Sequence, residues 1–380
     1  MSTKEPFALK WGILSCGNIS TTFTKDLLLD RGASQPTDIQ HIVTAAATSN
    51  SLSRAQTFLT TVKAPSSAIA YGSYAELIAD KDVEIIYIGT PHSHHYQHAR
   101  ACLEAGKHVL CEKAFTVNAE QTKELVKIAR AKGLFLMEAV WTRWIPLVRE
   151  VVGLVRSGKI GDVWRVIADL SFQAPMRELG NGNRLFNMDL AGGAMLDIGI
   201  YSITWVFLIL YHALPVEERR KPVVASSITR FETGSDEACS IIMNFLPKGT
   251  HGVAMSHLRV SDNPDNKHTA GPAVRIQGTE GEIQVYGPSF RPERYNIIPV
   301  EDNKTGLEFA DVTQEVQGRG MYWQADEAAR CIRDGKQESE DMSWEESIVI
   351  MEVMDEVRRQ GDMVYPDNIE SLEYPISELF

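Results

Sequence analysis

Short apolar runs alternate with amphipathic stretches over the first 140 residues of this chain. The apolar runs have the length of strands, and the segments between them place apolar residues at helical spacing, as at Phe23, Leu27 and Leu28. This alternation is typical of βαβ units that build a parallel sheet. The strands predicted from the pattern are 10–15, 41–48, 67–71, 84–89, 107–111 and 134–137.

The pattern changes after Trp141, where longer strand-like runs follow a predicted helix at 145–157. A turn at Gly278–Gly281 joins two of these runs, which indicates antiparallel hairpins in a sheet open on one face. The expected fold is therefore α/β, with a doubly wound parallel sheet and a second domain. Its predicted strands are 163–172, 223–232, 238–245, 252–260, 274–277 and 282–286, with late helices at 321–333 and 343–359 and an extended final stretch of twenty residues.

Composition places the 380 residues among ordinary globular proteins, with 44% hydrophobic and 23% charged residues. A net charge of −12 without a dense basic run argues against nucleic acid as a partner. The five cysteines form no C-x-x-C pair, which favours a reducing compartment over a disulfide framework. Because the first residues also lack the apolar core of a signal peptide, we expect a cytoplasmic protein.

One uncharged segment, Ile198–Val216, approaches the length of a membrane span. Its strongly apolar part, around Trp205 to Leu210, is too short to cross a bilayer. We therefore expect a buried core helix and no membrane partner.

A nucleotide-binding turn is indicated at Lys10–Ser20, which reads K-W-G-I-L-S-C-G-N-I-S. A strand that stops at a small-residue turn before a helix can offer unpaired amides to a pyrophosphate. Of the glycines in G-x-G-x-x-G only the middle one, Gly17, is kept, and serines stand at the other two places. A single glycine is also what any tight turn needs. The candidate cofactor contacts here are Ser15, Gly17, Asn18 and Ile19.

The end of the second strand bears on the choice between NAD and NADP. An acidic residue there would bind the ribose hydroxyls and repel a 2′-phosphate, and this chain has none. Ser49, Asn50 and Ser51 are neutral donors and Arg54 is a cation, a set that suits NADP. The alternative is a polar loop that caps a solvated helix.

The fourth strand leads into T-P-H-S-H-H-Y-Q-H, residues 90–98, at the edge where open α/β sheets bind ligands. His94 and His98 lie one helical turn apart, but no carboxylate in the cluster completes a ligand set, so no metal is predicted. Thr90 and its loop are expected to line the nicotinamide ribose, with His95 packed beneath.

Two further motifs carry acid and base groups. Glu112 and Lys113 end the fifth strand, where a lysine can polarise a substrate hydroxyl and favour the anion of a neighbouring phenol. Asp197 and Tyr201, four residues apart, would share a helical face. The alternatives are an exposed Glu-Lys pair at a turn and a hydrogen-bonded tyrosine of the core.

In this order the motifs resemble the glucose–fructose oxidoreductase/inositol dehydrogenase (Gfo/Idh/MocA) family over nearly the whole chain. The family's E-K-P motif corresponds to residues 112–114, where Ala114 replaces proline. G-G-x-x-x-D-x-G-x-[YH] corresponds to residues 192–201. T-P-N-x-x-H, with histidine in place of asparagine, corresponds to Thr90, Pro91, His92 and His95.

The resemblance implies two domains and a homodimer formed through the open sheet. An NADP-binding Rossmann domain would span 1–140. A C-terminal α+β domain for substrate binding and dimerisation, with a large open and mainly antiparallel sheet, would span 141–380.

Within the family, the chain is most similar to the branch of fungal NADP-dependent D-xylose 1-dehydrogenases and dimeric dihydrodiol dehydrogenases. That branch implies that Lys113 and Tyr201 transfer the proton and that Asp197 orients the sugar or Tyr201. It implies Glu112 and Lys113 at the cofactor and Trp141 and Arg143 near the substrate.

The expected reaction is oxidation of the C1 hydroxyl of D-xylose by NADP. Oxidation of a trans-dihydrodiol and a non-catalytic NADP-binding sensor stay open as alternatives. Asn50 stands where the branch often has arginine, which shifts the discrimination between NADP and NAD toward Arg54.

Overall fold

A six-stranded parallel sheet forms from the apolar runs of the first 140 residues, in the order β3-β2-β1-β4-β5-β6. The computed structural model describes residues 5–32, 38–304 and 306–379. All six predicted strands are confirmed, with ends shifted by a few residues. They are β1 Phe7–Leu14, β2 Ile39–Ala47, β3 Ile69–Tyr71, β4 Ile85–Ile88, β5 His108–Glu112 and β6 Leu136–Ala139.

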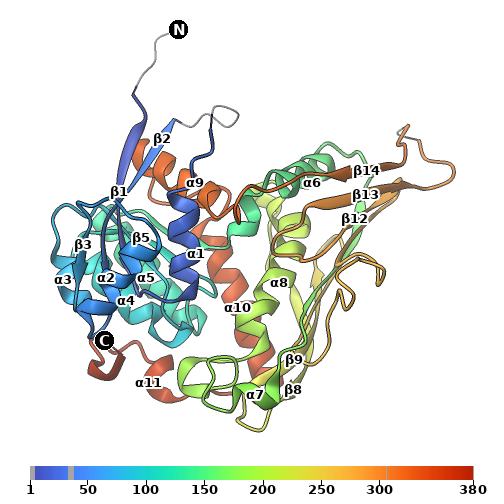
Figure 1. The fold of residues 1–380 in the computed structure, drawn as a ribbon. Coiled ribbons are helices and arrows are strands. Elements are labelled where there is room, and N and C mark those ends of the chain that lie inside the picture. The colour runs from blue at the N-terminus through green and yellow to red at the C-terminus, as the bar shows by residue number, and fades with distance from the viewer. Residues whose placement is uncertain (1–4, 33–37, 305, 380) are drawn as a thin grey trace. The chain divides into compact units, whose positions relative to one another are not determined.

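Three of the helices between these strands begin at a small polar cap, since Ser51, Ser73 and Asn118 each accept a hydrogen bond from an amide three residues on. Gly89, after β4, allows a close approach to the first helix, because a Cβ there would lie 2.2 Å from Ser20 Oγ. Figure 1 shows the order of these elements. The helices are α1 Asn18–Leu27, α2 Leu52–Thr61, α3 Tyr74–Ala79, α4 His92–Glu104 and α5 Ala119–Lys132.

The chain divides into two compact units, and the first includes two late segments. Besides the chain up to Trp141 it takes in Gln317–Ser347 and the residues from Asn368 on. Within it, α9 (Tyr322–Arg333) lies beside α1, and Asp326 accepts hydrogen bonds from Arg31 at 2.7 and 3.0 Å. The first compact unit thus contains late segments that lie beyond the predicted boundary between residues 140 and 141. The assignment of functions to the two domains stays a prediction.

The second unit, Thr142–Val316 with Ile348–Asp367, is built on an eight-stranded sheet in the order β14-β13-β12-β11-β7-β10-β9-β8. Its neighbours pair antiparallel except β7 and β10, which are parallel, so the sheet is mainly antiparallel, as predicted, but mixed. The predicted strands are β7 Val163–Ser171, β8 Val223–Arg230, β9 Asp236–Phe245, β10 Thr250–His257, β11 Val274–Gly278 and β12 Gly281–Val285; β13 Arg294–Pro299 and β14 Ala310–Thr313 were not predicted.

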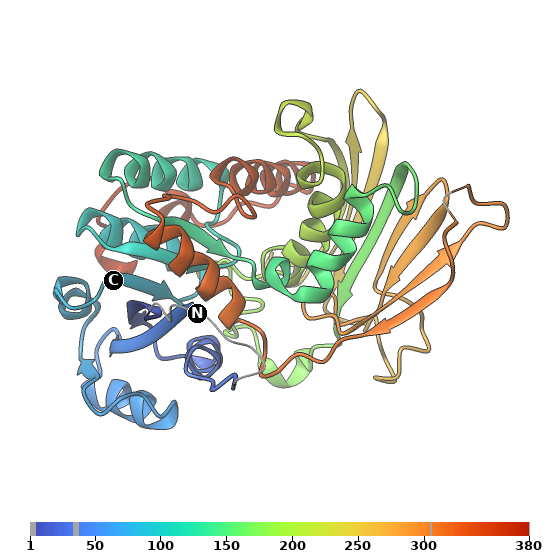
Figure 2. The same cartoon turned by 90° about the horizontal axis from the view of Figure 1, so that it is seen from above.

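Helices cover one face of this sheet and leave the other open, as Figure 2 shows. On the covered face a Cβ at Gly252 of β10 would lie 2.2 Å from Val206 Cγ1 of α8 (Ile200–Phe207), so the helix rests directly on the strand. On β9, Ile241 and Met243 are fully buried, whereas Ile242 between them is 50% exposed. Helix α6 (Pro146–Arg156) also packs on the covered side, where Tyr295 of β13 donates to Glu150.

The apolar run predicted as a core helix is confirmed as one. Among the described residues, one helical stretch, Met188–His212, is long and apolar enough to span a membrane by length and composition. Its most apolar window is entirely buried in the second unit.

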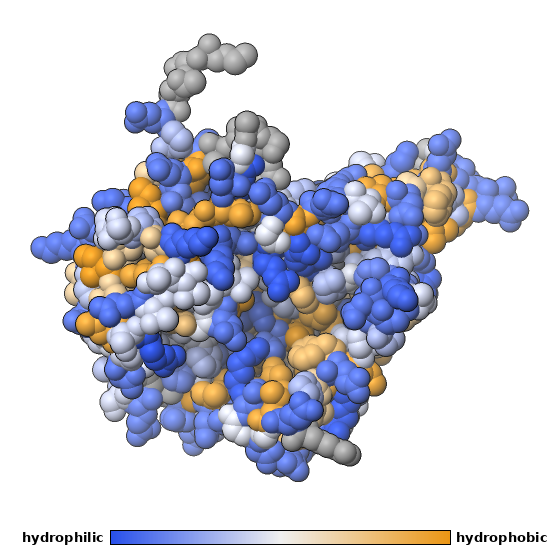
Figure 3. Space-filling view, in the orientation of Figure 1, coloured by the Kyte–Doolittle hydropathy of each residue, from blue (hydrophilic) through white to orange (hydrophobic). Residues whose placement is uncertain are grey.

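The late helices are α10 (Trp344–Gln360), in which the chain passes from the first unit to the second, and short α11 (Asp367–Glu370). With the 3₁₀ turn at Ser377–Leu379, α11 interrupts the final stretch that was predicted as extended. On the face drawn in Figure 3, hydrophilic residues predominate and hydrophobic ones are scattered among them.

Candidate active site

The dinucleotide turn follows β1, where Ser15 has a φ of +82° and its amide bonds Ala47 O at 3.1 Å. Gly17 is the N-cap residue of α1 and has no side chain that could occupy the amides of the first turn. A Cβ added at Gly17 would still lie 3.8 Å from the nearest side-chain atom, Ser15 Oγ. The amino end of α1 is therefore approachable by a phosphate, and its orientation favours an anion. These features fit a nicotinamide dinucleotide.

The loop after β2 holds the residues predicted to select the cofactor. Ser49 and Asn50, just past the carboxyl end of the strand, and Arg54, in the first turn of α2, are exposed. Ser51 accepts from Arg54 N at 3.4 Å and so caps α2. The capping interpretation thus holds for Ser51, while the other three side chains are accessible to a ligand.

Tyr74 is a further residue at this edge of the sheet, and no motif in the sequence singles it out. It begins α3, where Ser15, Ser49 and the charge of Arg54 act on its hydroxyl. Burial raises the pKa of Tyr74, although the two serines and the charge of Arg54 lower it. The signal was its place after the third strand, at the same sheet edge as the other candidates.

The histidine segment begins α4, and His95 is fully buried in it. The His95 ring nitrogens lie 2.8 Å from Thr90 O and 2.9 Å from Ala114 O, so the ring links the ends of two strands. Burial lowers the pKa of His95 to about 4, although both carbonyls favour the protonated ring. His92 is buried at the start of the helix. Over the described parts of the chain, no group of three or more His, Cys, Asp or Glu side chains is placed to hold a metal ion.

Glu112 and Lys113 end β5, and Glu112 is buried with 4% of its surface exposed. Its Oε1 accepts from Tyr87 OH at 2.6 Å, and Oε2 lies 3.3 Å from Lys113 N. The pair is thus no exposed turn: Glu112 is anchored in the protein, and Lys113 is half-buried at the carboxyl edge of the sheet. The Lys113–Ala114 peptide bond is cis.

Asp197 and Tyr201 belong to the second unit and lie on one continuous helical run. Met195–Gly199 is a π-turn, and α8 continues from Ile200. Both residues are almost buried, with 8% and 6% of their surface exposed. The π-turn replaces the regular α-helix expected here, and such turns occur frequently at functional sites.

Arg184 is a second residue that the sequence did not reveal. Its Nη1 lies 3.0 Å from Asp197 Oδ1, and its side chain is 57% exposed whereas that of Asp197 is 11% exposed. Arg184 comes from an irregular loop with no periodicity, so no spacing could have linked it to Asp197.

The predicted substrate residues Trp141 and Arg143 lie in a short 3₁₀ helix and are buried. Thr142 between them donates to Phe290 O at 2.6 Å, and the Phe290 ring lies 5.6 Å from that of Tyr201. In the second unit this contact links the segment after Trp141 to the helix of Tyr201.

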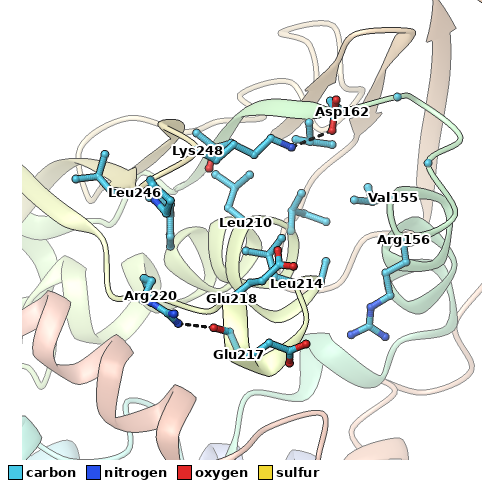
Figure 4. Close-up of a pocket in the computed structure, with 18 residues that line it drawn as sticks. Val155, Arg156, Asp162, Leu210, Leu214, Glu217, Glu218, Arg220, Leu246 and Lys248 are labelled. Carbon is cyan, nitrogen blue, oxygen red and sulfur yellow. Dashed lines mark hydrogen bonds and ion pairs between the residues drawn. The ribbon is translucent and has the colours of Figure 1, made fainter.

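A cavity of about 520 Å³ in the second unit contains none of the predicted site residues. Figure 4 shows its apolar wall, with Leu210 and Leu214, and a charged rim on which Lys248 pairs with Asp162 at 2.9 Å. The cavity is therefore separate from the candidate residues.

Comparison with known proteins identifies the class. The model of an oxidoreductase family with an NAD-binding Rossmann fold, Gfo/Idh/MocA, matches residues 9–140, and the model of the Gfo/Idh/MocA C-terminal domain matches residues 148–284. The chain is thus an NAD(P)-dependent oxidoreductase, and it belongs to the Gfo/Idh/MocA family.

Relatives match along almost the whole chain. A D-xylose 1-dehydrogenase (NADP(+)) of Hypocrea jecorina is 46% identical over 97% of this chain and 96% of its own length. A trans-1,2-dihydrobenzene-1,2-diol dehydrogenase of Bos taurus is 34% identical over 95% and 99%. The solved structure of KijD10, a 3-ketoreductase from Actinomadura kijaniata, shares the fold with a TM-score of 0.73 and 20% identity, over 93% of this chain and 98% of that one.

Proposed function

We propose that this protein oxidises the C1 hydroxyl of D-xylose to D-xylonolactone with NADP⁺. The observation that carries the proposal is the 46% identity to a D-xylose 1-dehydrogenase along nearly the whole length of both chains. The presence of Lys113, Asp197 and Tyr201 supports it, because these residue types can move the hydroxyl proton.

NADP⁺, when bound, accepts the C1 hydrogen as hydride. Tyr201 takes the proton of the C1 hydroxyl, so that the carbon–oxygen bond becomes the carbonyl of the lactone. Lys113 donates to the same oxygen and, as a cation, favours the phenolate form of Tyr201. Asp197, paired with Arg184, accepts a hydrogen bond from the sugar or orients Tyr201.

The preference for NADP over NAD is part of the proposal. Arg54 offers a cation to a 2′-phosphate, and Ser49 and Asn50 offer neutral donors without an acidic residue to repel it. The amino end of α1 would hold the diphosphate through backbone amides.

The test follows reduced-nicotinamide absorbance while NADP⁺ and NAD⁺ are crossed with D-xylose, D-glucose and a trans-dihydrodiol. Turnover of xylose with NADP⁺, at least tenfold above NAD⁺, is expected. The 34% identity to dihydrodiol dehydrogenases makes the dihydrodiol the second candidate, and turnover of it alone would replace the proposal. NADPH binding without turnover of any substrate would indicate a sensor.

We also propose that two copies associate through the open face of the eight-stranded sheet. Ile242 projects from this face with half of its surface exposed. On β8, Val223 stands two residues along from Ala225, the partner of Ile242, and is 61% exposed. Exposed apolar side chains that adjoin on one flat face are typical of an interface.

A further inference from the structure

A buried carboxylate in the second unit has no part in the reaction described above. Asp236, the first residue of β9, is fully buried. Its Oδ2 accepts from Met195 N at 2.6 Å. A Cβ at Gly193 would lie 2.0 Å from Asp236 Oδ1, so only a glycine at that place lets the carboxylate reach the turn.

The turn held in this way is the beginning of the helical run that carries Asp197 and Tyr201. A carboxylate at this end accepts from amides that have no partner inside the helix, and it faces the positive end of the helix dipole. Tyr365 holds the turn from another side, because its hydroxyl donates to Gly192 O at 2.9 Å.

We propose that Asp236 is a positioning residue that fixes where Asp197 and Tyr201 stand for proton transfer by anchoring the amino end of their helix. The inference rests on the proposed function, because Asp236 acts through these two side chains. A displacement of a reacting group by about 1 Å can cost on the order of 10²-fold in rate.

The chain contains a second buried carboxylate that anchors a helix start, and the helix it anchors carries no candidate site residue. In the first unit Asp26 is buried and accepts from Arg319 N and Met321 N, ahead of α9. A Cβ at Gly318 would lie 2.6 Å from Asp26 Oδ1. Asp26 and Asp236 thus share the same arrangement of a buried carboxylate, a glycine turn and a helix start.

The experiment compares Asp236→Asn with Asp26→Asn at pH 7.5. For Asp236→Asn, kcat for D-xylose should fall about 10- to 100-fold, with KM less affected and the Kd of NADPH within about twofold of wild type. For Asp26→Asn, kcat should stay within about twofold. Hydrogen exchange followed by mass spectrometry should accelerate over residues 194–201 in the first variant and over 319–326 in the second.

Equal kcat in the two variants, or wild-type exchange over 194–201 in Asp236→Asn, would overturn the inference. If wild type turns over no substrate, the proposed function fails, while the exchange data still decide whether Asp236 anchors the helix. If Asp236→Asn does not accumulate as folded protein, Tyr365→Phe serves instead. It removes one hydrogen bond from the same turn and leaves the buried Asp236 carboxylate unchanged. It should lower kcat about three- to tenfold and accelerate the same amides; unchanged values would contradict the proposal.

Discussion

At the residue scale, the chemistry proposed for Tyr201 is carried by one hydroxyl in an almost buried side chain. The matched comparison is Tyr211, which lies on the same helical run and is 4% exposed, with its ring 5.2 Å from that of Phe207. The two tyrosines share burial and helix, so replacing each by phenylalanine separates acid–base chemistry from packing.

Tyr201→Phe should lower kcat by about 10²- to 10⁴-fold, because it removes one positioned proton acceptor and leaves the ring in place. The Kd of NADPH, measured by fluorescence titration, should not change. Tyr211→Phe is the control and should keep kcat within about twofold. A parallel loss of kcat and NADPH binding in Tyr201→Phe would assign the tyrosine a structural role.

Ser15 is a residue in the left-handed region, where a side chain costs roughly 1 kcal/mol that glycine does not. Ser15→Gly should therefore raise the midpoint of thermal unfolding, measured by calorimetry without cofactor. Ser66→Gly, at an exposed turn, should give no increase. A lower midpoint for Ser15→Gly would show that the Ser15 side chain contributes more than its backbone conformation costs.

At the scale of elements, the loop after β10 brings Asp262 toward Asp169 of β7. Burial, and then the charge of Asp169, raise the pKa of Asp262 to about 6. The pKa of Asp169 is itself raised by burial, although the hydrogen bond from the Ser171 hydroxyl and, less strongly, His257 lower it. A second negative charge is therefore unfavourable where Asp262, in the loop after β10, lies near Asp169 of β7.

The stability of the protein should follow this titration. The native state holds a proton on Asp262 up to about pH 6, whereas the unfolded chain releases it near pH 4, so this group lowers the free energy of unfolding as pH rises from 4 to 6. Asp262→Asn should gain in thermal midpoint relative to wild type across that window. Asp302→Asn, at an exposed turn, should keep the wild-type pH profile. An identical profile for Asp262→Asn would refute the coupling.

At the scale of the whole molecule, the open face of the second sheet leads to a prediction about assembly. Wild-type protein should sediment with about twice the chain mass of 42.3 kDa. Ile242→Asp should shift it toward the single chain, because a charge in a dry interface costs several kcal/mol. The control Val364→Asp alters a side chain that is 70% exposed and lies outside the sheet. A dimer that persists in Ile242→Asp would place the interface elsewhere.

The sequence determined those features that a short stretch of chain encodes by itself. The six parallel strands, the buried run around Trp205 and most strands of the second sheet follow from apolar periodicity, because burial requires it locally. The sequence does not predict β13 and β14, because Asn296 and Asp311 interrupt the apolar pattern of these strands. The motifs at Gly17, Glu112 and Asp197 could be recognised because each stands at a strand end or a helix start. At Glu112 and Asp197 the side chain is also chemically specific, and at Gly17 its absence is the signal.

Only the tertiary structure decided which distant residues meet. Tyr74 between Ser15 and Ser49, Arg184 on Asp197, and Asp236 on Met195 are contacts across 13 to 59 residues with no local signal. The parallel pairing of β7 with β10 and the joining of α9 to the first unit are equally nonlocal. The periodicity of a segment specifies which face it buries. The partner of that face depends on the packing of the whole chain.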